Sequence, residues 1–551
     1  MALFAHYQRS AALRRCALAA VPLLFLACLC VAPMLRLLAE GSAGGAGVSN
    51  TGAQSGGYSS SGFIALWQDS YLRGRLVWSL LQAAASCAMV LVLGLPVAWV
   101  LARFDFAGRS VVLRLLMLPF VMPALVASLG VLALWGPQGL AMQFFGLDLQ
   151  DTPWLLVYGN VFFNLCLLVR AGVDGLGQVS SSQLAAARTL GASPWRAFWR
   201  IEWPTVRPWL VSSLCLVFLY CFSGFGIALI LGGQRYATLE VEIYTLVAHE
   251  LKLAEAGMLA VVTMAITGAA ALLYTLRESR LATPARGDAL ALRRPSTTLE
   301  RGMVALALGI LLLCCASPML AIALRVLLAG PGAWAVLLQE DTAAALWNTL
   351  RFSGMAVCLA SVLGLAHALA AQRSALVRWA ALLPFVVSPI TVAFGLLLLY
   401  PQWSASLPLL VAAYTLLAYP LVTQSITSAL GAIPANLHRA AHTLGASPWR
   451  CFWRVTFPLI LPALRRGMAF AAASALGEFA VSLFLARPEW TTLTTLIYQR
   501  LGRPGANSLN EALVLACLLV LLALAAFLAL EYRPAPAART CTPQRARPTH
   551  A

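Results

Sequence analysis

Few residues of this 551-residue chain are of the types that carry out catalysis, and none stands in a catalytic pattern. The six histidines form no H-E-x-x-H, no G-x-S-x-G segment marks a serine nucleophile, and the cysteines lack the C-x-x-C spacing of zinc sites. The only lysine, Lys252, follows Leu251, so it cannot belong to the G-x-x-x-x-G-K-[ST] loop that holds nucleotide phosphates. We therefore expect no catalytic, cofactor-binding or metal-binding residues, no cofactor, and a protein that is not itself an enzyme.

Three polar side chains stand inside strongly apolar segments, where a polar group is costly unless it is paired or hydrated. Glu478 lies in ALGEFAVSLF (475–484), and an acid in such a segment marks by default a pathway for a solute. Asn160 and Asn164 are one helical turn apart and would line the same path. The alternatives are a structural hydrogen bond for Glu478 and hydrogen bonds between helices for the two asparagines.

A string of eleven residues occurs twice. LGASPWRAFWR (190–200) returns as LGASPWRCFWR (444–454), with one position changed and an offset of 254 residues. The small and apolar residues before Gly191 predict a short helix, and Gly191 permits a turn. Ser193 and Pro194 then predict the N-cap and the first position of a second helix, which carries tryptophans and arginines.

Two interpretations of the repeated string are open. In one, the second helix is an interfacial anchor, with Trp195, Trp199, Trp449 and Trp453 at the level of the lipid headgroups. That interpretation does not explain the first short helix or the glycine. In the other, each helix–glycine–helix elbow is a docking element for a partner with two-fold symmetry.

The elements that carry these residues are membrane spans. The chain is 61% hydrophobic and only 11% charged, with a mean hydropathy of +0.82, which excludes an ordinary soluble domain. Apolar runs of about twenty residues recur, each long enough to cross a hydrocarbon core of about 30 Å. We expect an all-α polytopic membrane protein whose first span is retained. About twelve spans are predicted, near 16–38, 76–102, 111–135, 154–176, 207–231, 254–276, 302–326, 345–370, 376–400, 408–430, 464–486 and 510–530.

The formal net charge of +18 would indicate a nucleic-acid partner in a soluble protein. Here the basic residues concentrate in alternate loops, and placing the N-terminus in the cytoplasm puts most of them on the inner side. With twelve spans, both termini are then cytoplasmic. The charge is thus explained by topology, and the expected surroundings are a lipid bilayer rather than nucleic acid.

Two homologous six-helix halves are predicted, residues 1–290 and 291–551. Beyond the repeated string, VLGLPVAWVLAR (92–103) matches VLGLAHALAAQR (362–373) at an offset of 270. Both halves begin on the same side, so the repeat is parallel, with its axis along the membrane normal. The low-complexity stretch 41–62 predicts a flexible external loop.

The predicted third span of each half contains paired prolines in similar motifs. PFVMP occupies 119–123 and PFVVSP occupies 384–389. These prolines would break or kink the spans, as either a gate or a packing device.

Both copies of the repeated string belong to longer loops, about 183–208 and about 437–462, on the cytoplasmic side between the fourth and fifth spans. Each loop contains A-A-x-x-x-G and, nine residues later, I-x-x-P or V-x-x-P. This spacing resembles the EAA loop of the inner-membrane permeases of bacterial ABC importers. The matching residues are Ala186, Ala187, Gly191, Ile201 and Pro204 in the first loop and Ala440, Ala441, Gly445, Val455 and Pro458 in the second.

The resemblance implies the type I ABC importer permease fold in a bacterial inner membrane. It also implies a coupling role for both loops, two copies of a cytoplasmic ABC ATPase, and a periplasmic substrate-binding protein. One feature departs from the family, because its leading glutamate is replaced by Ala185 and Arg439. The contact assigned to that glutamate must be absent or replaced here.

The substrate prediction depends on three short stretches that look like the thiamine permeases of this family: WQDSYL (67–72), the G-x-Q-G step at 136–139, and LGGQRYATLEVEIY (231–244). Thiamine or its phosphates are therefore the first expectation. The ferric-iron branch shares the T-x-L-x-x-x-I-Y pattern at 491–498 and is the alternative. A secondary transporter, which also often has twelve spans, is the alternative of a different class.

Overall fold

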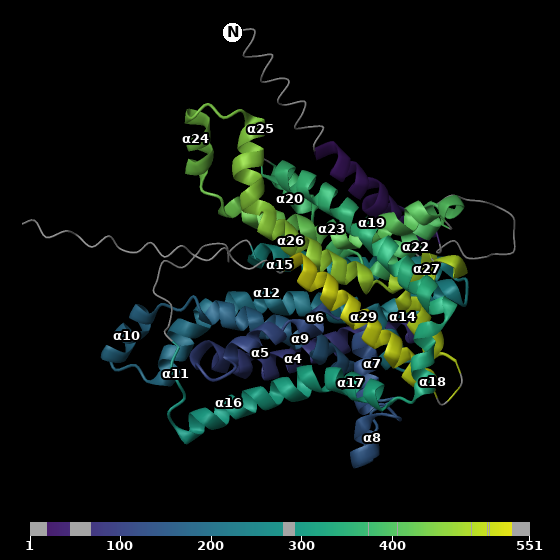
Figure 1. The fold of residues 1–551 in the computed structure, drawn as a ribbon, viewed down its shortest axis with the longest axis horizontal. Coiled ribbons are helices and arrows are strands. Elements are labelled where there is room, and N and C mark those ends of the chain that lie inside the picture. Colours follow the sequence, from purple (N-terminus) through teal and green to yellow (C-terminus); the bar gives the residue numbers. More distant parts are fainter. Residues whose placement is uncertain are drawn as a thin grey trace, which may run out of the picture.

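The computed structural model describes residues 19–43, 68–278, 292–372, 374–404, 406–485, 487–503, 505 and 507–531. These residues form an all-helical bundle (Figure 1). The expected boundary near 290, most of the expected loop 41–62 and both chain ends lie outside them. Within the described residues, eleven helices are long and apolar enough to cross a membrane: Ala19–Gly41, Ser70–Arg103, Ala124–Phe145, Pro153–Leu176, Pro194–Phe222, Leu253–Leu276, Thr298–Leu328, Glu340–Ala371, Leu407–Ala432, Pro448–Leu476 and Ser508–Leu530.

The ninth of the twelve expected spans, near 376–400, is not one continuous helix. It is divided into α20 (Ala375–Ala380), α21 (Leu383–Val386) and α22 (Pro389–Leu399). Its counterpart in the first half is divided in the same way, into α5 (Arg109–Leu115), α6 (Leu118–Val121) and α7 (Ala124–Trp135). Proline lacks the backbone N–H that would continue a helix, so the paired prolines explain both breaks. The eleven long helices and the shorter apolar helix Pro389–Leu399 account for the roughly twelve expected spans, and both third spans are broken as predicted.

Long helices in matching order form the frame of each half. The first half has α4 (Ser70–Arg103), α9 (Pro153–Leu176), α12 (Trp203–Phe222) and α15 (Leu253–Glu278). The second half has α19 (Glu340–Ala371), α23 (Leu407–Ala432), α26 (Phe457–Leu476) and α29 (Ser508–Glu531). The shorter helices include η1 (Ala27–Val31), α8 (Leu140–Phe145), α10 (Ser181–Thr189), α11 (Pro194–Ala197), η2 (Phe198–Glu202), α13 (Phe225–Leu231), α14 (Leu239–Ala248), α16 (Thr298–Leu311), η3 (Leu312–Ala316), α18 (Pro331–Trp334), η4 (Ala335–Leu338), η5 (Pro401–Trp403), α24 (Ala435–Thr443), α25 (Pro448–Cys451), η6 (Phe452–Thr456), α27 (Ala480–Leu485), η7 (Pro488–Trp490) and α28 (Leu493–Leu501).

The repeat extends to single hydrogen bonds. The N–H of Leu239, at the start of α14, donates to Ser79 Oγ of α4 at 2.9 Å. The N–H of Leu493, at the start of α28, donates to Thr349 Oγ1 of α19 at 2.8 Å. These pairs are related by the same offsets as the sequence repeat, 254 and 270 residues.

The first helical segment of each half packs on the other half. In the first half, α2 (Ala32–Ala43) packs against α22, and in the second, α17 (Ser317–Leu328) packs against α7. A Cβ placed on Gly395 of α22 would lie 2.9 Å from Pro33 Cβ, and one on Gly130 of α7 would lie 3.0 Å from the Pro318 carbonyl oxygen. The two halves are therefore joined by a reciprocal exchange of helices.

Candidate functional site

The two repeated strings fold into matching elbows. The first elbow is residues 181–202 (α10, α11 and η2), and the second elbow is residues 435–456 (α24, α25 and η6). Gly191 and Gly445 both have φ of 77°, the left-handed conformation that glycine adopts without steric cost. The hydroxyl of Ser193 accepts the N–H of Arg196 at 3.3 Å, and Ser447 repeats this cap in the second elbow. The predicted sequence of short helix, glycine turn and serine N-cap is confirmed in both copies.

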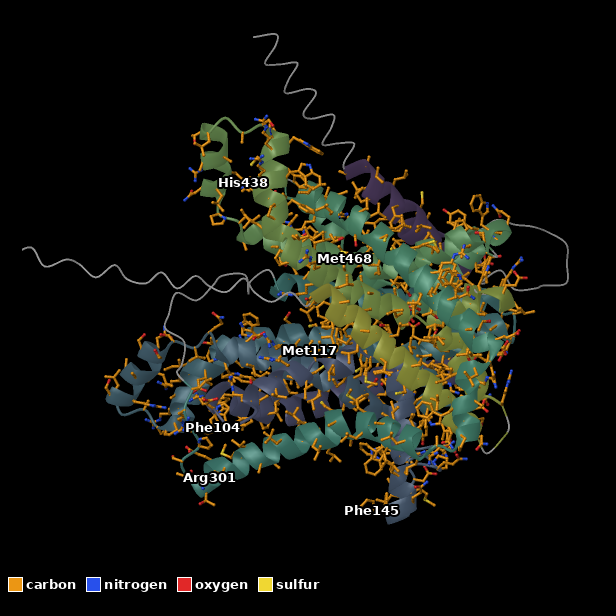
Figure 2. All side chains as sticks on the ribbon, viewed as in Figure 1. Phe104, Met117, Phe145, Arg301, His438 and Met468 are labelled. Atoms are coloured by element: carbon orange, nitrogen blue, oxygen red, sulfur yellow. The ribbon has the colours of Figure 1, made fainter. Side chains whose placement is uncertain are left out.

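The elbows present apolar side chains to solvent at one end of the molecule. Leu190 and Leu444, beside the turn glycines, are 88% and 86% exposed, and Trp195 and Trp449 are each 70% exposed. Figure 1 shows α10–α11 and α24–α25 at the same end. In Figure 2, His438 of the second elbow lies at this end, as do Phe104 and Arg301 near the first elbow. Paired apolar tips of this kind fit the docking interpretation.

The residues that match the EAA pattern, which extends two residues beyond each elbow, have the same burial in both copies. In each copy, the leading alanine, the glycine and the proline are exposed. The second alanine and the branched aliphatic residue are half-buried. The exposed set is Ala186, Gly191, Pro204, Ala440, Gly445 and Pro458, and the half-buried set is Ala187, Ile201, Ala441 and Val455. At the positions of the missing glutamates, Ala185 and Arg439 are exposed, and Arg439 Nη2 donates to Asn436 Oδ1 at 2.8 Å.

A cavity of about 290 Å³ lies between the two halves, where their broken spans meet. Glu478, in the break between α26 and α27, is the only charged residue among the described residues that line it. Its Oε1 accepts the N–H of Val481 at 3.1 Å, so the carboxyl group is held at the start of α27. A Cβ on the adjacent Gly477 would lie 2.8 Å from Pro123 Cβ of the other half. The aromatic residues of the lining are Phe120, Phe163, Tyr220, Phe385 and Phe470.

The two asparagines do not line this cavity. Asn160 Nδ2 donates to Gln82 Oε1 at 2.8 Å and to Ser86 Oγ at 3.2 Å, both on α4. Asn164 Nδ2 donates to the Asn160 carbonyl at 2.9 Å. Gln82 in turn donates to the Cys221 carbonyl of α12 at 2.9 Å. These contacts use the amide groups to join α4, α9 and α12, as the interhelical alternative predicts.

Sequence reasoning missed three buried acids outside the cavity, Glu202, Glu240 and Glu242. Glu202, the last residue of η2, pairs with Arg103 at the end of α4. Glu240 of α14 accepts a hydrogen bond from Ser388 Oγ of the other half at 2.6 Å. The apolar neighbours of Glu240, Leu239 and Val241, were a signal of burial that the sequence did contain.

The sequence matches the family described as "Binding-protein-dependent transport system inner membrane component" over residues 91–273 and again over 356–533. It is 28% identical over 503 residues to the thiamine transport system permease protein ThiP of Escherichia coli (strain K12), covering 86% of this chain and 91% of that protein. It is 27% identical over 486 residues to ThiP of Haemophilus influenzae, covering 83% and 88%. A shorter match, 32% identical over 176 residues, joins it to the sulfate transport system permease protein CysW of a Synechocystis strain, covering 31% of this chain and 63% of that protein.

Proposed function

The chain belongs to the family of binding-protein-dependent transport system inner membrane components, and from this membership we propose that it imports thiamine or its phosphates from the periplasm. It is a multi-pass inner-membrane permease with a duplicated permease domain, and it is not itself an enzyme. Transport systems of this type depend on an ATPase and on a binding protein as partners. The same membership argues against the secondary-transporter alternative.

Thiamine as the substrate is supported first by the relatives. ThiP proteins from several organisms match this chain over most of their length, whereas the sulfate permease matches less than a third of this chain. The single observation that carries the proposal is therefore the extent of the ThiP match. It agrees with the three short stretches that resemble thiamine permeases.

The cavity between the halves supports the same class of substrate. Thiamine carries a permanent positive charge on an aromatic ring, and aromatic side chains with one carboxylate attract such a cation. The described lining offers five aromatic rings and the carboxyl group of Glu478. Ferric iron would instead need several hard oxygen ligands, which this mainly apolar lining does not supply. We therefore place Glu478 on the translocation path and leave Asn160 and Asn164 as interhelical contacts.

The two elbows are proposed as the docking sites of two ATPase copies. Their exposed leucines and tryptophans occur in matched pairs, as a two-fold symmetric partner requires. The coupling contacts would come from the ten residues that match the EAA pattern, with Gly191 and Gly445 setting the turns. Since Ala185 and Arg439 replace the family's glutamates, the docking depends on shape and apolar contact rather than on that acid.

The proposed orientation places both termini and both elbows in the cytoplasm. The halves are taken as residues 1–290 and 291–551. Closure of the ATPase pair would draw the elbows together and rock the two halves about their contact, which passes the substrate inward from a binding protein docked outside.

The test uses the permease purified with its ATPase and reconstituted in vesicles that contain ATP, with the binding protein and the labelled thiamine outside. ATP-dependent uptake of labelled thiamine is compared between the wild type and Glu478→Gln, which removes the charge and keeps the shape. We expect uptake to fall by about tenfold, because an interaction of roughly 1.4 kcal/mol corresponds to that factor. The control is Glu40→Gln, which removes the charge from a partly exposed ion pair with Arg36, neither of which lines the cavity.

Three outcomes would overturn the proposal. Uptake of ferric iron without uptake of thiamine would place the protein in the ferric-iron branch of the family. Uptake that continues without ATP under a proton gradient would assign a secondary carrier. Normal thiamine uptake by Glu478→Gln would remove that residue from the path.

A further inference from the structure

The first elbow is joined to α4 by a buried ion pair. Arg103 Nη2 contacts Glu202 Oε1, and both side chains are largely shielded from water. Arg103 ends α4, and its guanidinium group also lies over the Trp99 ring, 5.4 Å from the ring centre. Glu202 ends the π-helical turn η2, where the first elbow runs into α12. Separating two such buried charges is costly, so the elbow and α4 are expected to move together.

The second elbow is joined differently. Its π-helical turn η6 has the same length and position, but the residue equivalent to Glu202 is Thr456. The hydroxyl of Thr456 is 3.1 Å from His438 Nε2 on α24, so this contact stays inside the elbow (Figure 2 labels His438). A threonine cannot form an ion pair, so among the described residues the ionic connection between an elbow and the second span of its half occurs in the first half alone.

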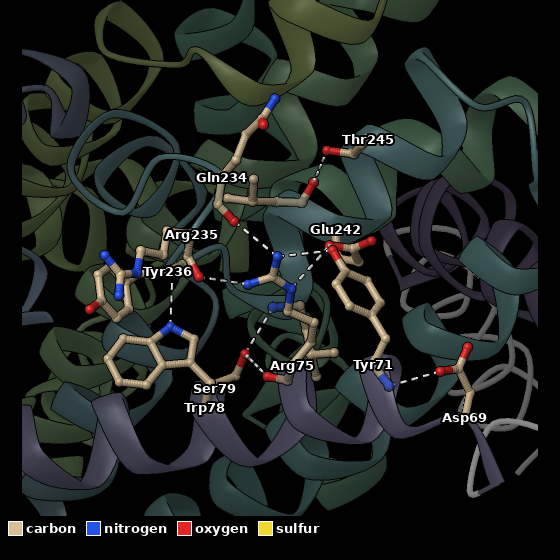
Figure 3. A network of polar contacts seen from close by, with 12 residues as sticks. Asp69, Tyr71, Arg75, Trp78, Ser79, Gln234, Arg235, Tyr236, Glu242 and Thr245 are labelled. Carbon is tan, nitrogen blue, oxygen red and sulfur yellow. Dashed lines mark hydrogen bonds and ion pairs between the residues drawn. The ribbon is translucent and has the colours of Figure 1, made fainter. Parts of the chain in front are cut away.

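At its other end, α4 holds the segment that leads into α14 (Figure 3). Tyr71 donates to Glu242 Oε2 at 3.0 Å, and Arg75 lies 3.6 Å from the same oxygen. Arg75 also donates to the carbonyl groups of Gln234 and Arg235, both at 2.9 Å. The bond from Leu239 N–H to Ser79 Oγ completes this attachment.

The same short helix reaches the other half. Glu240 and Glu242 are two positions apart on α14 and point to different neighbours. Glu240 is fully buried, and its Oε2 accepts the hydroxyl of Ser388 at 2.6 Å. Ser388 is the N-cap of α22, since it also accepts the N–H of Thr391 at 3.1 Å. Leu239, which Ser79 of α4 holds, is thus adjacent in sequence to Glu240, which contacts the other half.

Of the charged members of this connection, Arg103 alone has a charged counterpart in the second half, Arg373, which lies outside the residues that the structure describes. By the repeat offsets, Arg75 corresponds to Ala345, and Glu242 corresponds to Leu496. Glu240 corresponds to Thr494, whose hydroxyl donates to the Glu478 carbonyl within its own half at 2.9 Å. The uncharged attachments are kept. The Ser79–Leu239 bond recurs as Thr349–Leu493. The bond from Trp78 Nε1 to the Tyr236 carbonyl, at 2.9 Å, is matched by bonds from Asn348 Nδ2 to the carbonyls of Glu489 and Thr491, at 3.0 and 3.1 Å.

We propose that α4 is a strut that carries movement of the first elbow to the Glu240–Ser388 contact between the halves, and that the described residues of the second half lack the charged contacts that fix this strut at both ends. The helix spans 34 residues, or about 51 Å at 1.5 Å per residue, and continues unbroken through Pro96. A single rigid element fixed by polar contacts at both ends transmits displacement over that length. Arg103 and Glu202 are positioning residues in this scheme. The strut proposal rests on the proposed docking of an ATPase at the elbows.

The test measures distances in the full complex of permease, ATPase and binding protein. Spin labels are placed at Gly74 and Leu338, in a background where the native cysteines are replaced. Gly74 has open space beside it near the outer end of α4, and Leu338 is highly exposed just before α19. The distance between the labels is measured without nucleotide and with a non-hydrolysable ATP analogue.

In the otherwise unchanged chain, the analogue should shift this distance. Glu202→Gln should reduce the shift to less than about half, and Glu202→Asp, which keeps the charge, should restore part of it. Arg75→Gln removes the charged contacts at the other end of α4 and should reduce the shift by the same amount. It replaces Glu202→Gln in the test if that variant does not fold. Thr456→Val, the matched change in the second elbow, should leave the shift intact.

Two results would overturn the strut. One is a full shift in Glu202→Gln while the ATPase remains bound. The other is an equal loss in Thr456→Val, which would make the two elbows equivalent. If no ATPase copurifies with the wild type, the docking proposal itself fails, so the two failures are distinguishable.

Discussion

Glu240 is a carboxyl group that the fold removes from water. It lies on α14, outside the eleven candidate spans, and is fully buried. Burial raises the pKa of Glu240 from 4.5 to about 8, because the charged form loses its hydration, and the hydroxyl of Ser388 offsets this only in part. The folded protein therefore holds a proton on Glu240 that the unfolded chain releases at neutral pH.

This raised pKa predicts a pH-dependent effect of Glu240→Gln on stability. Between pH 4.5 and about 8 the folded state binds the proton and the unfolded state does not, so the wild type loses stability as the pH rises through this window. Glutamine does not titrate. The melting temperature of Glu240→Gln relative to that of the wild type should therefore rise by a few degrees as the pH increases over the same range. Thermal unfolding of the purified protein in detergent at several pH values measures the difference.

Ser388→Ala is the control for this measurement, because it removes the hydroxyl but keeps the buried carboxyl. It should retain the pH slope of the wild type. A difference between Glu240→Gln and the wild type that does not change with pH would contradict the prediction.

Single residues could be predicted where their neighbours in sequence define their surroundings. Glu478 was identified because an acid in an apolar segment is conspicuous, and it does line the cavity. The pairing of Arg103 with Glu202 could not be predicted, because it depends on how two distant helices meet. Glu240 stands in an alternating segment whose apolar members indicate burial, but nothing in the sequence identifies Ser388 as its partner.

The elbows are elements whose geometry depends on one backbone conformation. Gly191 and Gly445 have φ of 77°, and no other residue lies within 4 Å of where a Cβ would be. A side chain there would therefore meet no steric obstacle, and its cost would come from the backbone alone. Alanine in this conformation costs about 1 kcal/mol, and a β-branched residue costs more.

We expect a graded effect on coupling from this cost. Gly191→Ala and Gly445→Ala should reduce binding-protein-stimulated ATP hydrolysis mildly, and Gly191→Val and Gly445→Val should abolish it, while all four insert in the membrane. The measurements are ATPase rates of the reconstituted complex and the yield of folded permease. Full stimulation in the valine variants would show that the turn does not matter for coupling.

Elements encoded by local sequence were predicted well. The glycine turn and the serine caps of both elbows follow from residues within a few positions of each other. The third span of each half was less predictable, because hydropathy averages across the proline breaks that divide 376–400. The π-helical turns η2 and η6 were missed, since no short-range residue pattern marks the extra residue that they accommodate.

At the scale of the whole molecule, the two halves are held together by exchanged helices as well as by the cavity walls. The α2 helix covers α22, and α17 covers α7, with close contacts of Pro33 to Gly395 and of Pro318 to Gly130. Hydropathy predicts where the spans lie, and internal homology predicts the repeat. Neither indicates which half a helix will pack on.

The exchange predicts that the two halves can assemble as separate chains. Residues 1–290 and 291–551 expressed together should copurify and support ATP-dependent uptake, because each supplies a helix that the other needs. Removal of residues 1–43 from the first piece should reduce recovery of the pair strongly. Equal recovery with and without residues 1–43 would contradict a structural role for the exchange.

The reciprocal packing also fixes an order of events during synthesis. When the first half has left the ribosome, the face of α7 that will contact α17 is still without its partner. The nascent chain must keep that face in the lipid until Ser317–Leu328 has been translated. The first half can therefore reach its final packing only after translation has passed the middle of the message.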